Sequence, residues 1–200
     1  MQLIDTHCHL NDPKFSHDWR QAVERAIAAG VRAFVVVGYD LASSRTAVEL
    51  AHEHDAIYAA VGIHPHDARD ADAQALRTVA DLATDPRVVA IGESGLDFFR
   101  DLSPRDVQRR AFADFIKLAA DIDKPLIVHS RDADAEVLEV LAETLSEGQR
   151  VVRHCFAGGP ETVAAYARLG CYVGIAATIT YPKADDVRAA AAAAPAHLIV

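Results

Sequence analysis

Two histidines, His7 and His9, follow a short apolar run near the start of the chain. Residues two apart on an extended segment point to the same side, so both imidazoles can reach one metal ion while Cys8 faces away. Taken alone, such a pair is as readily explained as two accidental surface residues. Its place at the end of a predicted strand favours metal binding, because the active sites of parallel barrels lie at the C-terminal ends of their strands.

His52 and His54 have the same spacing and provide an internal control. They lie at the end of a predicted helix, where residues two apart are rotated by about 200 degrees from one another. These two imidazoles cannot easily bind one ion. We assign them to a solvated helix C-terminus, where a histidine is compatible with the helix dipole.

Polar side chains also end four later predicted strands: His64 and His66, Glu93, His129, and His154. Each taken singly is better explained as a hydrogen-bonded buried side chain. Five such strand ends are harder to dismiss, because a barrel brings them together, and nitrogen with carboxylate ligands suits zinc, manganese or a related divalent ion. A pair of ions would lower the pKa of a bound water and polarise the bond under attack, with Glu93 as the shared carboxylate.

The elements that must position these residues alternate between short β-branched strands and longer amphipathic helices. The predicted strands are residues 3–5, 31–37, 57–61, 88–92, 126–129, 151–154, 172–175 and, incompletely, 198–200. The predicted helices are residues 19–28, 43–52, 73–83, 104–120, 133–145, 160–169 and 184–194. Gly30 after the first helix, Ser43 before the second and Pro104 at the start of the fourth are typical of helix ends.

Apolar runs without alternation, such as residues 33–37, indicate parallel strands covered on both faces. Seven strand–helix units and the start of an eighth predict an α/β fold, a TIM-barrel-like (β/α)8 barrel, for which roughly 250 residues is typical. We expect the chain to be truncated within the eighth strand, without the rest of that strand and its helix. A doubly wound open sheet is the structural alternative.

Composition limits the class of protein. The chain has 200 residues, 51% of them hydrophobic, which predicts a single domain spanning residues 1–200. Its formal charge of −9 argues against wrapping nucleic acid by bulk electrostatics, but leaves open a local basic groove or a metal-neutralised site. No stretch is long and apolar enough to span a bilayer, so we expect a soluble protein without a membrane partner. No interface signature predicts an oligomeric state.

The three cysteines, Cys8, Cys155 and Cys171, form no disulfide framework, which suits a reducing, cytoplasmic location. The proposed metal chemistry needs no cysteine nucleophile. Cys155 is adjacent to His154, so it is predicted to point to the other side of the strand as a buried structural thiol.

Five motifs occur in an order that resembles the TatD family of metal-dependent deoxyribonucleases, within the amidohydrolase-like barrels. They are residues 4–10 (IDTHCHL), 62–66 (GIHPH), 92–98 (GESGLDF), 129–133 (HSRDA) and 154–158 (HCFAG). The resemblance covers essentially all of the chain. It implies that His7 and His9 bind one metal ion, that Glu93 bridges, and that His129 and His154 bind the second.

The resemblance further implies hydrolysis of phosphodiester bonds in DNA, often from a 3′ end, with two Mg, Mn or Zn ions. His64 would lie beside the substrate as a binding or catalytic group. Arg100, Arg131 and Lys183 are candidates to hold phosphates, and each is equally well explained as an ordinary solvated cation. Hydrolysis of an amide, lactone or phosphotriester by the same metal pair is the alternative within enzymes.

One departure from the family pattern concerns the first metal ion. The family has a further metal-binding aspartate just after the last strand, and this sequence ends at Val200, before that point. Asp5, the nearest spare carboxylate, is predicted to orient a histidine rather than to bind an ion. The sequence therefore leaves open a non-catalytic metal-binding chain, or a fragment of a longer product.

Overall fold

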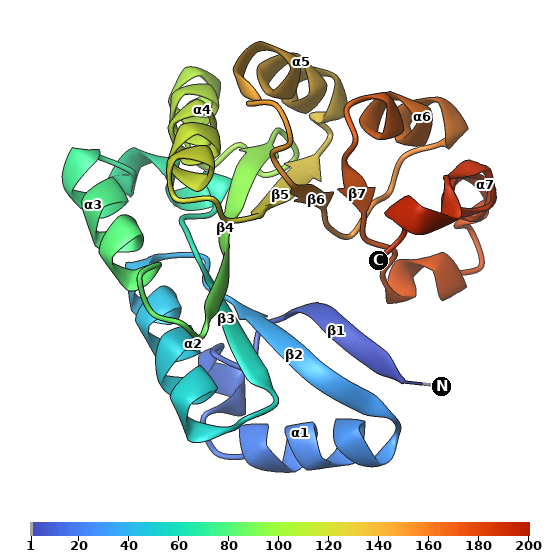
Figure 1. Cartoon of the computed structure of the whole chain (residues 1–200). Coiled ribbons are helices and arrows are strands. Elements are labelled where there is room, and N and C mark those ends of the chain that lie inside the picture. The colour runs from blue at the N-terminus through green and yellow to red at the C-terminus, as the bar shows by residue number, and fades with distance from the viewer. Residues whose placement is uncertain (1) are drawn as a thin grey trace.

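The computed structural model describes residues 2–200. Seven parallel strands form one sheet in which the order of the strands is their order in the chain (Figure 1). The strands are β1 (Leu3–Cys8), β2 (Val31–Val37), β3 (Ile57–Val61), β4 (Val88–Asp97), β5 (Leu126–Arg131), β6 (Val151–Arg153) and β7 (Tyr172–Val173). Parallel neighbours require a long crossover connection, which here is supplied by helices.

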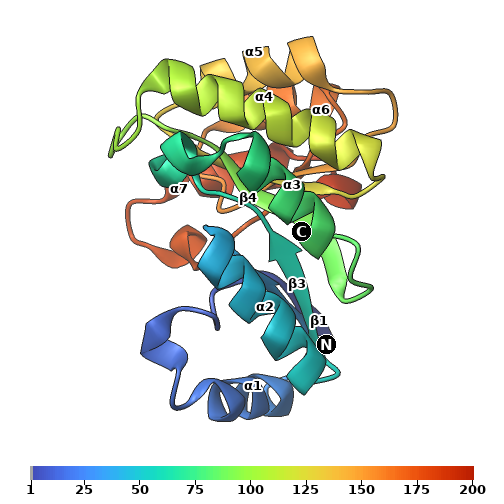
Figure 2. The ribbon, with the colours of Figure 1, turned by 90° about the vertical axis from the view of Figure 1, so that its left-hand side faces the viewer.

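Helices lie along the outer, convex side of the curled sheet (Figures 1 and 2). They are α1 (Trp19–Ala28), α2 (Leu41–Glu53), α3 (Ala73–Leu82), α4 (Arg105–Asp121), α5 (Asp134–Thr144), α6 (Pro160–Arg168) and α7 (Asp185–Ala193). The short 3-10 turns are η1 (Pro13–Phe15), η2 (Pro65–Asp70), η3 (Ala177–Thr180) and η4 (Ala196–Leu198). The predicted α/β, TIM-barrel-like fold is confirmed, as a curled partial barrel.

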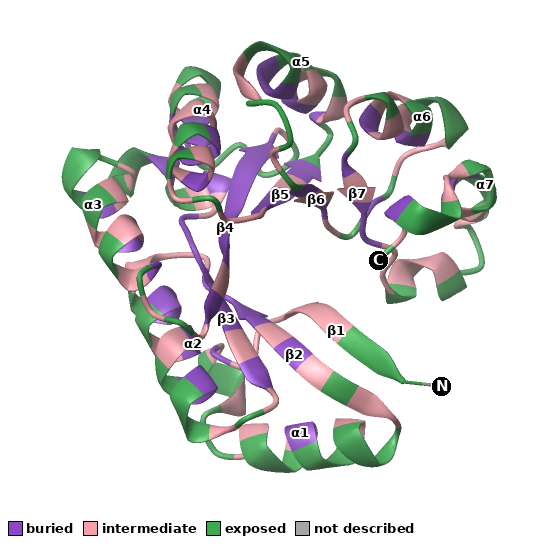
Figure 3. Cartoon of the chain, in the orientation of Figure 1, coloured by how far each residue is buried: buried purple, intermediate pink, exposed green. Residues whose placement is uncertain are grey.

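Two apolar layers cover the two faces of the strands. The larger lies between the sheet and the helices, and it includes Phe112, Phe115 and Ile116 of α4, all fully buried (Figure 3). The smaller lies on the opposite face of the central strands and is built from Val37, Ala60, Ala90 and Ile127. Burial on both faces explains why these strands show no alternation of apolar and polar residues.

Several predicted boundaries are wrong, each for a local reason. Helix α2 begins earlier than predicted because Asp40, not Ser43, is its N-cap; the two residues form a reciprocal capping box. Strand β4 continues to Asp97, five residues beyond the predicted end, through two glycines that weaken the strand signal. The predicted eighth strand is represented by a single parallel bridge between Ile199 and Val173.

The sheet does not close into a ring among residues 2–200. Strand β1 pairs with β2 on one side, and its other edge faces the Ile199 bridge across an opening (Figure 1). A pocket of about 400 Å³ fills this opening between β1 and Val200. Ile4 is 63% exposed there. No helix in the described part of the chain is both long and apolar enough to cross a membrane.

Candidate metal centre

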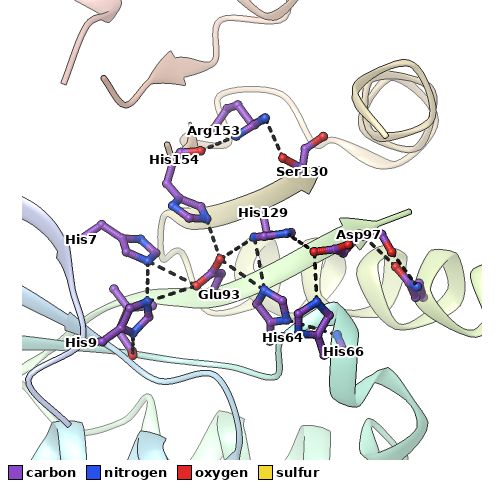
Figure 4. A network of polar contacts seen from close by, with 12 residues as sticks. His7, His9, His64, His66, Glu93, Asp97, His129, Ser130, Arg153 and His154 are labelled. Atoms are coloured by element: carbon purple, nitrogen blue, oxygen red, sulfur yellow. Dashed lines mark hydrogen bonds and ion pairs between the residues drawn. The ribbon is translucent and has the colours of Figure 1, made fainter. Parts of the chain in front are cut away.

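Glu93 of β4 lies at the centre of the histidines (Figure 4). Its side chain is only 3% exposed. Oε2 lies 3.2 Å from Nε2 of His7 and 3.8 Å from Nε2 of His9. Oε1 lies 2.8 Å from Nδ1 of His129 and 2.5 Å from Nε2 of His154. One carboxylate therefore contacts imidazoles from β1, from β5 and from the end of β6.

Two glycines beside Glu93 allow β4 to approach β5 closely enough for these contacts. Gly92 has φ of +130° and Gly95 has φ of +148°, conformations that side-chain-bearing residues rarely adopt. A Cβ atom at position 95 would lie 2.0 Å from the carbonyl oxygen of His129. The sequence GESG thus places the carboxylate between two points of close backbone approach.

His7, His9 and Glu93 form the first group of potential ligands, with ligand atoms all within 4.8 Å of one another. Nδ1 of His9 donates to the carbonyl oxygen of Val37 at 2.9 Å, which leaves the lone pair on Nε2 free for an ion. Cys8 contacts the carbonyl oxygen of Val35 instead. The prediction that the two imidazoles share a side and that Cys8 faces away is therefore confirmed.

His64, Glu93 and His129 form the second group, again within 4.8 Å. Nε2 of His64 lies 3.2 Å from Nδ1 of His129. His154, which we expected in this group, approaches Glu93 from the other side and stacks on His7, with ring centroids 3.9 Å apart. The structure thus brings the five expected ligands together, and His64 lies beside them.

Asp97, at the end of β4, holds His129 from the side opposite Glu93. Its Oδ2 accepts hydrogen bonds from Nε2 of His129 at 3.1 Å and from Nε2 of His66 at 3.0 Å. Its Oδ1 accepts from the main-chain N–H groups of Phe99 and Arg100. A carboxylate behind a histidine fixes the ring and its tautomer, so that Nδ1 of His129 is the atom available to an ion.

The protonation states of these groups suit divalent cations. Burial lowers the pKa of His64 to about 3 and that of His154 to about 4, so both imidazoles are neutral. Burial by itself raises the pKa of Glu93, but the surrounding imidazoles, His154 first among them, hold that pKa well below its ordinary value. Neutral imidazoles and an ionised carboxylate are the metal-binding forms. Nδ1 of His7 is also buried without a hydrogen-bond partner.

A pocket of about 400 Å³ opens over both groups. Its lining includes His9, His64, His129 and His154 together with Asp12, Tyr39 and Asp67 from the loops after β1, β2 and β3. Water or a small substrate group therefore has access to the ligand atoms. The residues present fit a centre for divalent ions.

The three predicted phosphate-holding cations lie outside this pocket. Arg100, Arg131 and Lys183 are all exposed, and none has a carboxylate partner among residues 2–200. The guanidinium of Arg131 lies 3.9 Å from the centroid of the Phe99 ring. Lys183 lies between η3 and α7 in the chain.

Of two expectations about neighbouring residues, the one for Cys155 is wrong, and Asp5 holds a histidine only through its main chain. Cys155 is exposed, because β6 ends at Arg153 and the backbone at Cys155 turns to φ of +45°, so the alternation of a strand no longer applies there. Asp5 does not contact an imidazole; its Oδ1 accepts the main-chain N–H of His7. Asp97 was missed as a partner of the ligands, because it lies beyond the predicted end of its strand.

Comparison with known proteins identifies the family. The family model described as TatD related DNase matches residues 4–200. The chain belongs to the TatD-related DNase family. The predicted family and the class of metal-dependent hydrolase are confirmed.

Several TatD relatives are similar over most of the chain. The uncharacterized metal-dependent hydrolase YabD of Bacillus subtilis is 38% identical over 182 residues, which are 91% of this chain and 71% of YabD. The 3′-5′ ssDNA/RNA exonuclease TatD of Escherichia coli K12 is 35% identical over 173 residues, covering 86% of this chain and 66% of that protein. The chain thus spans about two thirds of the length of that exonuclease.

Solved structures agree with this assignment. The TatD homologue YjjV of Escherichia coli K12 superposes with a TM-score of 0.92 at 31% identity, over 99% of this chain and 77% of that one. A TatD family protein from Entamoeba histolytica has a TM-score of 0.87 at 20% identity, over the whole of this chain and 72% of that one, which supports the fold.

Proposed function

We propose that this protein is a divalent-metal-dependent phosphodiesterase that removes nucleotides from the 3′ end of single-stranded DNA or RNA. The observation that carries the proposal is the position of Glu93, which faces imidazoles of both ligand groups with its two oxygens. The names of the relatives supply the substrate class. We further propose that residues 1–200 form one hydrolase domain that binds two ions.

The roles of the residues follow from their contacts. His7 and His9 would hold one ion and His129 with His154 would hold the other, with the carboxylate of Glu93 between the two groups. Bound ions would activate a water molecule and stabilise charge on the phosphate oxygens. Asp97 keeps Nε2 of His129 occupied and its Nδ1 free.

His64 is oriented towards the pocket by the main chain. Its Nδ1 accepts the N–H of His66 at 3.2 Å, so the hydrogen of the neutral ring is on Nε2, the nitrogen that faces His129. This atom can donate a hydrogen bond to a phosphate oxygen held between the two groups. The structure therefore favours a substrate-binding role for His64.

The test combines metal content with cleavage. The chain is compared with Glu93→Gln by elemental analysis and by digestion of a 3′-labelled single-stranded oligonucleotide in manganese or magnesium. We expect the variant to lose cleavage by at least about a hundredfold, since even partners of metal ligands contribute 10- to 100-fold. Glu139→Gln, an exposed glutamate paired with Arg109, is the matched control and should keep full activity.

Each outcome is informative. Cleavage that persists in Glu93→Gln would exclude the proposed centre. Bound metal without cleavage of any nucleic acid would favour an amide, lactone or phosphotriester substrate, or a non-catalytic chain.

A further inference from the structure

A largely exposed aromatic side chain, Phe99, lies two residues after Asp97, the carboxylate that holds His129. Phe98 and Phe99 follow Asp97 at the end of β4. Phe98 packs against the core, whereas Phe99 is 58% exposed. A large aromatic side chain on a surface is informative when it lies beside a functional site.

The backbone around Phe99 is held in place. Its N–H donates to Oδ1 of Asp97 at 3.1 Å, and the N–H of Phe98 donates to the carbonyl oxygen of Arg131 at 2.9 Å. Gln108 of α4 adds bonds to the main chain of Asp97 and Ser103. The ring therefore projects from a fixed support, and through Asp97 that support is connected to His129 (Figure 4).

Arg131 lies next to Phe99 and contributes a positive charge. Arg131 is the last residue of β5 and lies two residues after His129. Its side chain therefore starts on the same face of the strand as that of His129, closer to the C-terminal end of the strand. Its guanidinium lies 3.9 Å over the ring of Phe99. Arg131 has no carboxylate partner in the described part of the chain. Its charge is therefore available to a ligand.

The charges on the rest of the rim direct a polyanion towards this side. Asp12 and Asp67, from the loops after β1 and β3, line the pocket with negative charge. Phosphates are repelled from that side. On the β4–β5 side, Arg131 carries a positive charge directly over the Phe99 ring, the combination that binds single-stranded nucleic acids.

We propose that Phe99 and Arg131 form a subsite in which one nucleobase of a single-stranded polynucleotide stacks on the ring while the guanidinium contacts a flanking phosphate. This inference rests on the proposed function and specifies how its substrate is held. Every base has an aromatic face, so the subsite selects for the presence of a base and not for its identity.

The experiment separates binding from cleavage. Affinity for a labelled single-stranded oligonucleotide is measured by fluorescence anisotropy with calcium present, and cleavage is measured with manganese. A second oligonucleotide carries abasic residues at its last three positions. Phe99→Leu removes the ring, Phe99→Tyr retains it, and Arg131→Lys retains the charge without the planar group.

We expect the chain to prefer the base-bearing oligonucleotide over the abasic one about tenfold, in Kd and in KM, since stacking of one base contributes about 1–3 kcal/mol. Phe99→Leu should abolish this preference with little change in kcat, and Phe99→Tyr should preserve it. Tyr58→Leu removes an arginine-stacked ring at the opposite ends of the strands, and it should keep the preference intact.

The failures are distinguishable. A preference that survives Phe99→Leu overturns the subsite, whether or not the chain cleaves DNA. Binding with the expected preference but without cleavage supports the subsite and refutes the proposed nuclease function. Absence of binding to either oligonucleotide refutes both.

Discussion

Asp97 contacts the candidate metal centre through its histidines. One of its oxygens holds His129 and His66, and the other holds the main chain of the next loop. Burial by itself raises the pKa of this carboxyl group, but hydrogen bonds from the Arg100 N–H, His66 and His129 lower it. Asp97 therefore stays ionised and acts as a fixed acceptor.

We predict that Asp97→Asn lowers cleavage by about 10- to 100-fold, because an amide can present an N–H to Nε2 of His129 and favour the wrong tautomer. The loss should appear in kcat and in the affinity for manganese, measured by calorimetry, while circular dichroism stays unchanged. Asp101→Asn, an exposed neighbour paired with Arg105, is the control. Unchanged manganese affinity in Asp97→Asn would contradict the orienting role.

At this scale the sequence predicts the ligands better than their surroundings. The convergence of five candidate ligands was predictable because strand ends meet in a parallel barrel: His7, His9, Glu93, His129 and His154. The partner Asp97 was not, because two glycines conceal the continuation of its strand. The exposure of Cys155 depends on one backbone angle, which alternation cannot predict.

Strands β5 and β6 are tied together by a buried arginine. Arg153 is 1% exposed, and it donates to Oδ1 of Asp134 at 3.0 Å and to the carbonyl oxygen of Ser130 at 2.8 Å. It also contacts the carbonyl oxygen of His154, as Figure 4 shows. Tyr166 of α6 donates to the same oxygen of Asp134. The main chains beside His129 and His154 are thereby fixed relative to one another.

We predict that Asp134→Asn lowers the free energy of unfolding by about 3 kcal/mol, because a buried guanidinium loses its counter-charge. Urea denaturation measures this loss. Asp123→Asn, which alters an exposed pair with Arg150, should have a much smaller effect. Similar losses of unfolding free energy in the two variants would show that the burial of Arg153 does not strengthen its pair with Asp134.

The pH dependence of this pair has a definite sign. Burial by itself raises the pKa of Asp134. The charge of Arg153 and the hydrogen bonds that the carboxylate of Asp134 accepts lower that pKa below its ordinary value of 3.8. The contribution of Asp134 to stability is therefore complete above pH 3.8 and is lost as the pH falls through the lowered pKa. Asp134→Asn should accordingly be less sensitive to acid than the parent chain.

Elements were predictable where periodicity is strong. The range predicted for α1 and that for β2 match the structure. The start of α2 could not be predicted from the sequence, because both Asp40 and Ser43 are good N-cap residues. Only the reciprocal hydrogen bonds between them show that Asp40 is the N-cap. The pattern of residues 198–200 suits a strand, yet the structure has one bridge there, since a strand needs neighbours to pair with.

At the scale of the whole molecule, we predict that binding of divalent ions is strongly stabilising. Ligands that bind only the folded state add about 2.7 kcal/mol when present at a hundred times their dissociation constant. A chelator should therefore lower the melting temperature measured by calorimetry, and added manganese should restore it. An identical melting temperature with and without chelator would contradict the metal centre.

We expect the stabilisation by bound ions to be largest at the opening beside β1. No backbone ladder joins β1 to the strands across the gap within residues 2–200, but His7 stacks on His154 there, and Glu93 reaches both rings. Side-chain contacts thus connect the two edges of the sheet at a place where backbone hydrogen bonds do not. Ions at these imidazoles would act as a clasp, so stripping them should speed amide hydrogen exchange in β1 far more than in β4. The same side chains would then carry out catalysis and hold the open edges of the barrel together.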